Sequence, residues 1–196
     1  MAWEFDLLQW FQTIHNPVLD YIMAGLSLLG EAGILWIGIA IVFLCIPRYR
    51  KCGFAMAIAL ILSLIFCNGI MKNLVQRDRP FWIDGGLLTQ IEAMKDSVPS
   101  WLHIVIPTDF SFPSGHTSAS FAAAAAILML HRKEGIAAIV VAALISLSRL
   151  YIGVHFPTDV LVSLVLGTIY GIVAVVVVKF IYRKIEEKRG EIKENA

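Results

Sequence analysis

Residues 160–178 read VLVSLVLGTIYGIVAVVVV, a stretch without a single charged side chain. A helix needs roughly 20 apolar residues to cross a hydrocarbon core about 30 Å thick, so this stretch is long enough to span a membrane. Working outward from it, the chain contains further apolar runs at 21–30, 32–47, 52–71, 110–130 and 135–148. The sequence therefore predicts an all-α, polytopic membrane protein built as a bundle of six transmembrane helices.

The composition supports this class and excludes others. Of 196 residues, 58% are hydrophobic and 16% are charged, against about 25% charged in a typical soluble domain. Six spans leave little room for a separate soluble domain, so residues 1–196 are expected to form one membrane-embedded domain. A net charge of +1 gives no basic field, which argues against nucleic acid as a partner. Cys45, Cys52 and Cys67 match no Cys/His metal-ligand spacing, so neither a structural zinc nor an iron–sulfur cofactor is expected.

The placement of Lys and Arg predicts the orientation of the helices. Most of the 16 basic residues fall between the second and third expected spans, between the fourth and fifth, or after the sixth. Because positively charged loops stay in the cytoplasm, these ends and both chain termini are expected to be cytoplasmic. The opposite ends are then expected on the extracellular or periplasmic side. Five basic residues fall there against the bias and need a chemical reason: Lys72, Arg77, Arg79, Lys95 and Arg149.

Two amphipathic stretches lie outside the expected spans. In the first, Trp3, Leu7 and Ile14 recur at helical spacing opposite Glu4 and Gln9, which predicts an N-terminal interfacial helix anchored by tryptophan. Packing of this stripe on the bundle is the alternative. The second is the outer-side loop between helices 3 and 4, residues 81–112, which we expect to be an apolar lid or a simple cover for the bundle. Its apolar residues at helical spacing are Leu87, Leu88, Ile91 and Met94.

Gly167 and Gly171 form a pair of small residues, four positions apart, in the last expected span. Such pairs let two helices approach closely in a membrane. Close packing within the bundle is the favoured interpretation, and a homodimer seam is the alternative.

Polar motifs lie at the outer ends of the third and fourth expected spans. The first, KNLVQRDRP at residues 72–80, carries Lys72 and Arg79, and arginine offers a planar fork of donors that suits phosphate oxygens. Snorkelling of basic side chains at a helix end is the alternative. The second, SFPSGHT at residues 111–117, offers Ser114 as a helix N-cap and Gly115 where a ligand could approach the backbone amides. His116 in that first turn is well placed to give a proton to a leaving oxygen.

A third motif, SRLYIGVHFPTD at residues 148–159, joins the fifth and sixth expected spans. Arg149 ends one helix, and Asp159 lies in the first turn of the next, near His155. An ionised aspartate that holds one ring nitrogen of a histidine makes the other nitrogen a better nucleophile or base. Of the two motif histidines, only His155 has an evident carboxylate partner. An inert polar pair would not explain why two histidines, an aspartate and several cations recur at one face.

Together the three motifs resemble the signature of the type 2 phosphatidic acid phosphatase superfamily. The match consists of Lys72, six residues, then Arg79-Pro80; Pro113-Ser114-Gly115-His116; and Ser148-Arg149, five residues, His155, three residues, Asp159. It runs from residue 72 to 159, and six spans resemble the bacterial membrane members over nearly the whole chain. The resemblance implies a metal-independent lipid phosphatase with its catalytic motifs at the outer ends of the helices.

The resemblance also implies a role for each motif residue. His155 would attack phosphorus to give a phosphohistidine, Asp159 would orient it, and His116 would protonate the departing oxygen and then activate water. The residues implied to hold the phosphoryl oxygens are Lys72, Arg79, Ser114, Gly115 and Arg149. Arg77 is not part of the motif and is expected to be a charge at the rim of the site.

The implied substrate is a lipid phosphate or diphosphate at the outer leaflet. Undecaprenyl diphosphate ranks first, with phosphatidylglycerol phosphate and phosphatidic acid as alternatives. A non-catalytic lipid-binding or transport protein would use the same cations, but it would need neither His116 nor the pair of His155 and Asp159. The expected partners are therefore the lipid phosphate and the surrounding membrane lipids.

Overall fold

The computed structural model describes residues 2–102 and 104–194, and all regular structure in that part of the chain is helical. The elements are α1 (Ala2–Thr13), α2 (Pro17–Gly30), η1 (Glu31–Gly33), α3 (Ile34–Cys45), α4 (Arg50–Leu62), η2 (Ser63–Met71), α5 (Lys72–Val75), α6 (Pro80–Ile83), α7 (Gly85–Ser97), α8 (Gly115–Leu130), α9 (Arg132–Tyr151) and α10 (Pro157–Glu194). The all-helical class predicted from the sequence is confirmed.

Four helical segments in the described part of the chain are long and apolar enough to cross a membrane. They are Pro17–Cys45, Arg50–Ile83, Arg132–Tyr151 and Pro157–Gly190. The alanine-rich α8 is shorter and packs against both α9 and α10. The expected count of six spans is not confirmed, because the first two expected runs form one continuous segment and the fourth forms α8, which has only 16 residues.

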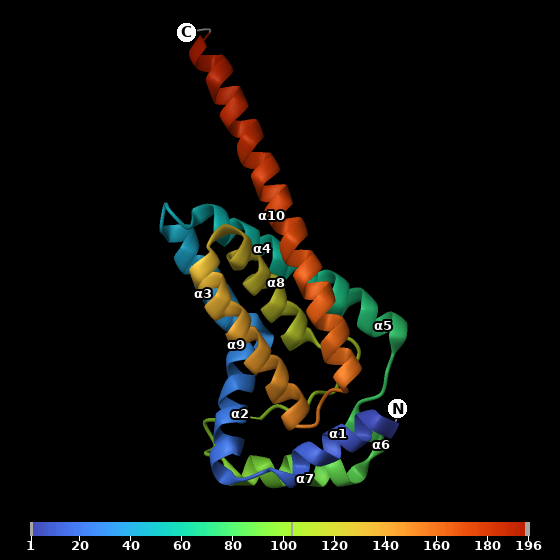
Figure 1. Ribbon diagram of the computed structural model, residues 1–196. Helices are drawn as coiled ribbons and strands as arrows, with labels where there is room; N and C mark the ends of the chain where they lie inside the picture. The colour runs from blue at the N-terminus through green and yellow to red at the C-terminus, as the bar shows by residue number, and fades with distance from the viewer. Residues whose placement is uncertain (1, 103, 195–196) are drawn as a thin grey trace.

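That first segment bends without folding back. Between α2 and α3, Ala32 and Gly33 have left-handed φ angles of 49° and 70°, a conformation that costs little for glycine and is uncommon for alanine. After the bend the chain continues along the bundle in the direction of α2 (Figure 1). As a result, α1 and the far end of α10 lie at opposite ends of the bundle, which differs from the expectation that both termini share one side.

A layer of helices lies across the end of the bundle where the chain begins. α1, α6 and α7 form this layer, roughly perpendicular to the long helices (Figure 1). The helical spacing predicted within the 81–112 loop is confirmed by α7, whose apolar face is buried against the bundle rather than turned outward. The buried residues of this contact include Leu8 and Phe11 of α1, Leu87, Ile91 and Met94 of α7, and Tyr151 and Ile152.

The N-terminal helix presents a different face from the one its sequence suggests. Glu4, expected on the outer face, is buried together with Leu8 and Phe11. Trp3 and Trp10 are about half exposed, at 52% and 53%. The helix itself is confirmed, whereas its position at a membrane interface is not.

The glycine pair in α10 packs this helix against α8. A Cβ atom at Gly167 would lie 2.4 Å from the carbonyl oxygen of Ser118, and one at Gly171 would lie 2.6 Å from that of Ala122. Neither position has room for a side chain, so the pair serves contact within this chain.

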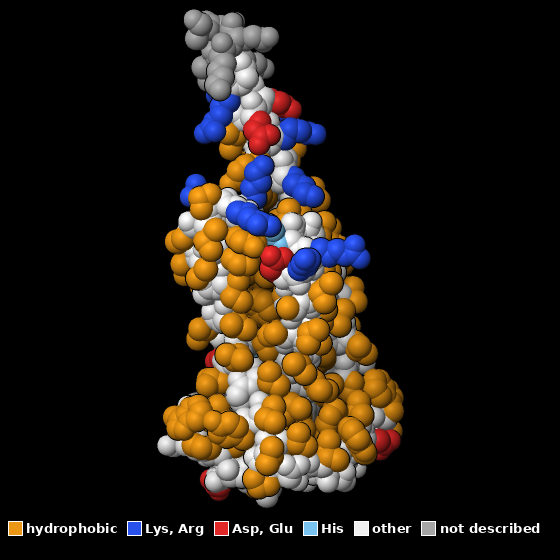
Figure 2. Space-filling view, turned by 60° about the vertical axis from the view of Figure 1, so that its left-hand side comes forward, with side chains coloured by type: hydrophobic (Ala, Val, Ile, Leu, Met, Phe, Trp, Pro, Cys, Tyr) orange, Lys and Arg blue, Asp and Glu red, His pale blue; other side chains and the backbone are white. Residues whose placement is uncertain are grey.

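The surface is consistent with a multi-pass membrane protein. Hydrophobic side chains cover most of the visible face, and Lys and Arg gather toward the end from which α10 projects (Figure 2). Exposed isoleucine, leucine and valine side chains occur on α3, α4, α9 and α10. An apolar surface of this extent is stable against lipid and would be unfavourable in water.

Candidate functional site

The three sequence motifs converge on one cavity of about 560 Å³. Its polar end is lined by Lys72, Arg79, Asp109, Gly115, His116, Arg149 and His155. Ser114 and Asp159 lie behind this lining and are fully buried. All eight residues predicted from the sequence are thus at or directly behind one cavity, although they come from three separate motifs of the chain.

His155 lies in the short connection between α9 and α10 and is 2% exposed. Its Nδ1 is 3.7 Å from Asp159 Oδ2, too far for a direct hydrogen bond. The hydroxyl of Ser111 stands between them, 3.5 Å from Nδ1, and donates to Asp159 Oδ2. The opposite ring nitrogen, Nε2, lies 3.4 Å from Arg79 Nη1. The sequence placed Ser111 at the start of a motif but gave no sign of this contact.

The surroundings of His155 keep its ring neutral. Burial lowers the pKa of His155 to about 3, and the positive charges of Arg79 and Arg149 act in the same direction. Asp159 opposes this effect without overcoming it. The ring therefore holds an available lone pair at any physiological pH, as a nitrogen nucleophile requires.

His116 also has a carboxylate partner, which the sequence did not reveal. Its Nε2 lies 3.3 Å from Glu31 Oε2 at the bend between α2 and α3. The two segments approach closely here, because a Cβ atom at Gly30 would lie 2.9 Å from Cδ2 of the His116 ring. The negative charge of Glu31 acts on the His116 ring, but Nε2 makes no hydrogen bond among the described residues that would fix the orientation of the ring.

Three buried cations surround the two histidines. Lys72, Arg79 and Arg149 are 8%, 1% and 3% exposed. Arg149 donates from Nη1 to Ser27 Oγ, but its buried Nε has no hydrogen-bond partner among the described residues. Burying cations in this way is unfavourable unless an anion compensates them, which marks the cavity as an anion site.

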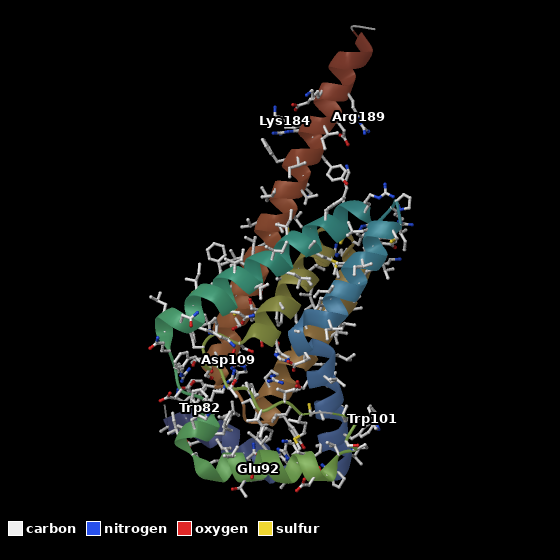
Figure 3. All side chains as sticks on the ribbon, turned by 180° about the vertical axis from the view of Figure 1, so that it is seen from behind. Trp82, Glu92, Trp101, Asp109, Lys184 and Arg189 are labelled. Atoms are coloured by element: carbon white, nitrogen blue, oxygen red, sulfur yellow. The ribbon has the colours of Figure 1, made fainter. Side chains whose placement is uncertain are left out.

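In this structure the anion is a carboxylate of the protein. Asp109 lies in the connection between α7 and α8 (Figure 3). It pairs with Lys72 and accepts a hydrogen bond of 2.6 Å from Arg79 Nη2. Burial raises the pKa of Asp109, but Lys72 and Arg79 outweigh that effect and lower it to about 2. Sequence reasoning assigned no role to Asp109, since it stands outside the motifs in an irregular loop.

Ser114 and Gly115 are placed differently from the simple anion site expected at the start of α8. Ser114 is the N-cap by position, but its side chain makes no capping hydrogen bond, and its amide N–H donates to Ser163 Oγ at 2.6 Å. That amide is therefore already occupied. A Cβ atom at Gly115 would lie 2.7 Å from Oδ1 of Asn68 on η2, so glycine permits close approach of these two helices.

Arg77, expected to be a rim charge, instead binds the carboxylate behind His155. Its Nη1 lies 2.6 Å from Asp159 Oδ1, and its Nη2 lies 2.8 Å from Glu4 Oε2. The N-terminal helix is thereby connected to the polar end of the cavity. The sequence could not indicate this pairing, because Glu4 and Asp159 are far apart in the chain.

Comparison with known proteins identifies the family of the chain. Residues 48–183 match the PAP2 superfamily. An undecaprenyl-diphosphatase of Sulfolobus acidocaldarius is 30% identical over 76% of this chain and 66% of its own length. A lipid A 4'-phosphatase of Bacteroides thetaiotaomicron is 27% identical over 84% of this chain and 72% of its own length.

A solved structure extends the similarity to the fold. The crystal structure of the transmembrane PAP2-type phosphatidylglycerolphosphate phosphatase from Bacillus subtilis superimposes with a TM-score of 0.66 at 25% identity. The alignment covers 94% of this chain and 86% of the other. The superfamily predicted from the three motifs is confirmed, and with it the enzyme class of a hydrolase that acts on lipid phosphates. The chain belongs to the PAP2 superfamily of lipid phosphatases.

Proposed function

We propose that this chain removes a phosphate from a long-chain lipid phosphate or diphosphate through a phosphohistidine on His155. The observation that carries the proposal is the cavity, which holds cations and histidines at one end and is apolar along the rest. Its apolar part runs between α3 and α4 and is lined by Ile37, Ile41, Leu44, Ala57, Leu60 and Ile61.

The apolar part of the cavity suits a chain that stays in the bilayer. At 1.5 Å per residue, the 12 residues of α3 extend about 18 Å, which is enough to accompany several isoprene units or most of an acyl chain. Ile41 and Ile61 are 56% and 54% exposed on the surface that would face lipid. A lipid tail can therefore lie along the groove while its headgroup reaches the cations.

The proposed reaction uses side chains alone. The Nε2 lone pair of neutral His155 forms a bond to phosphorus while the bond from phosphorus to the leaving oxygen breaks. Asp159, with Ser111, keeps the proton on Nδ1, and His116 gives a proton to the leaving oxygen and then activates water. The charge on the phosphoryl oxygens is neutralised by Lys72, Arg79 and Arg149, and electrostatic stabilisation of this kind supplies most of the catalysis in phosphoryl transfer.

Undecaprenyl diphosphate is the substrate we rank first, supported by the similarity to the Sulfolobus undecaprenyl-diphosphatase. The test is phosphate release by the purified protein in detergent with EDTA. The panel should contain undecaprenyl diphosphate, phosphatidylglycerol phosphate, phosphatidic acid and lipid A. His155→Ala should be inactive on every substrate, while His131→Ala, at the opposite end of the bundle, should retain activity. Activity in His155→Ala would refute the mechanism.

We further propose that the site faces the extracellular or periplasmic side. The basic residues at the α3–α4 and α8–α9 turns lie at the other end, and such ends stay in the cytoplasm. Glu92 and Lys184 lie toward the opposite ends of the molecule (Figure 3). In a variant without the exposed Cys45, Glu92→Cys should react with a membrane-impermeant thiol reagent in intact cells and Lys184→Cys should not. The reverse labelling would place the site in the cytoplasm.

A further inference from the structure

The carboxylate behind His155 is the most enclosed charge of the site. Asp159 is fully buried, and its Oδ2 accepts from the N–H of Phe156 at 2.9 Å and from Ser111. Because His155 is neutral at rest, it does not balance the charge of Asp159. The cation that does so is Arg77, whose Nη1 lies 2.6 Å from Asp159 Oδ1.

Arg77 is itself held on several sides. Its Nη1 also donates to Thr158 Oγ1 at 2.7 Å, and its guanidinium carbon lies 4.0 Å from the centroid of the Phe156 ring. Its Nη2 donates to Glu4 Oε2 at 2.8 Å. Glu4 is 3% exposed, and its other oxygen accepts from Thr158 Oγ1 at 2.6 Å. The guanidinium is therefore fixed between two buried carboxylates, one on α10 and one on α1.

The charges of this group match what the reaction at His155 needs. Asp159 and Arg77 alone would cancel, leaving no net charge to stabilise the positive ring that forms when Nε2 binds phosphorus. Glu4 adds a second negative charge, so the group carries −1 at rest and becomes neutral together with the charged ring. A buried positive charge is far less costly beside a net negative group than beside a neutral one.

We propose that Glu4, acting through Arg77, is a positioning residue that fixes the Asp159 carboxylate and sets the net charge opposite His155. This inference rests on the proposed function, since it assumes that His155 is the nucleophile. Glu4 lies outside the 48–183 segment that matches the superfamily. The N-terminal helix thus contributes to the chemistry of the site rather than only covering it.

The alternative is that the ion pair merely fastens α1 to the start of α10. A purely structural role predicts that removal of the Glu4 charge lowers thermal stability and impairs kcat and KM to the same degree. A charge-setting role predicts a defect in the chemical step, with binding of phosphate preserved. Vanadate separates the two further, because its five-coordinate adduct on His155 resembles the transition state, whereas inorganic phosphate resembles the ground state.

The experiment compares Glu4→Gln and Glu4→Asp with Asp6→Asn, an exposed carboxylate on the same helix. In Glu4→Gln, kcat should fall about 10- to 100-fold, as when the outer partner of a reacting group is removed. KM and inhibition by inorganic phosphate should stay within about twofold, and inhibition by vanadate should weaken in proportion to kcat. Glu4→Asp keeps the charge and should recover part of kcat, while Asp6→Asn should match the parent.

Each other outcome has a defined meaning. Unchanged kcat in Glu4→Gln, or a lowered thermal midpoint with equal loss of phosphate and vanadate inhibition, would overturn the inference. A kcat of Glu4→Asp no higher than that of Glu4→Gln would also overturn the inference. His155→Ala serves as the reference in the same assays. Activity in that variant would refute the proposed function, whereas an inactive His155→Ala beside a normal Glu4→Gln would refute only the present inference.

Discussion

Asp109 binds two of the cations that are proposed to hold the substrate phosphate. Its carboxylate contacts Lys72 and Arg79 together, and these are two of the three cations expected to hold phosphoryl oxygens. A bound phosphate must therefore displace Asp109 or lie beside it. Asp109→Asn removes the competing charge with almost no change in shape, so it should strengthen the binding of phosphate.

The size of this effect follows from the geometry. The carboxylate of Asp109 and the guanidinium of Arg79, with charge centres about 4 Å apart, interact by about 4 kcal/mol at an effective dielectric constant of about 20. The Asp109 side chain is 55% exposed, so solvent screens most of this interaction and about 1 kcal/mol remains. A difference of about 1 kcal/mol corresponds to a roughly fivefold change in a binding constant.

The assay is competitive inhibition of phosphate release by inorganic phosphate at pH 7, where the low pKa of Asp109 keeps it fully ionised. Asp109→Asn should lower the inhibition constant about fivefold and should lower KM for the lipid phosphate. Asp96→Asn, on the exposed side of α7, controls for a general change of charge and should have no effect. Weaker inhibition in Asp109→Asn would refute the reasoning, since Asp109 would then be holding the cations in place for substrate.

Further predictions concern acid catalysis, packing, protonation and metals. His116→Ala should lose less activity on a nitrophenyl phosphate than on an alkyl phosphate, because an acidic leaving group hardly needs a proton; equal losses would contradict this role. Gly167→Ala should reduce the free energy of unfolding by about 1–3 kcal/mol through overpacking, because its Cβ would lie 2.4 Å from Ser118 O. Thermal melts should therefore show a lower midpoint for Gly167→Ala but not for Gly38→Ala, which has open space around it. His155 resists protonation when folded, with a pKa of about 3, but binds a proton below about pH 6.5 when unfolded. The contribution of His155 to the free energy of unfolding should therefore be fully present above pH 6.5 and should fall toward pH 3 by up to about 1.4 kcal/mol per pH unit. Thermal melts of His155→Gln should show a smaller loss of stability over this pH range. An equal loss in the variant would contradict the buried neutral ring. Phosphate release should survive EDTA and be inhibited by vanadate, and restoration of EDTA-treated enzyme by Mg²⁺ would contradict a reaction driven by side chains alone.

The sequence by itself determined the helical class and named eight residues that lie at or beside the cavity. Lipid offers no hydrogen bonds to the backbone, so long apolar runs such as residues 160–178 have to be helical. The motif residues could be named for a similar reason, because polar groups such as Arg149 and His155 are costly at the end of an apolar helix unless they serve a purpose. The α7 helix was likewise visible in the spacing of Leu87, Ile91 and Met94.

The tertiary structure alone decided how the chain turns and which charges meet. The bend at Ala32 and Gly33 joins two apolar runs into one segment, and local hydropathy is the same whether a chain bends or folds back there. That bend brings Glu31 to His116, and the layer formed by α1 brings Glu4 to Arg77. An ion pair depends on the distance between two charges in space, and helices far apart in the sequence set that distance only after they pack.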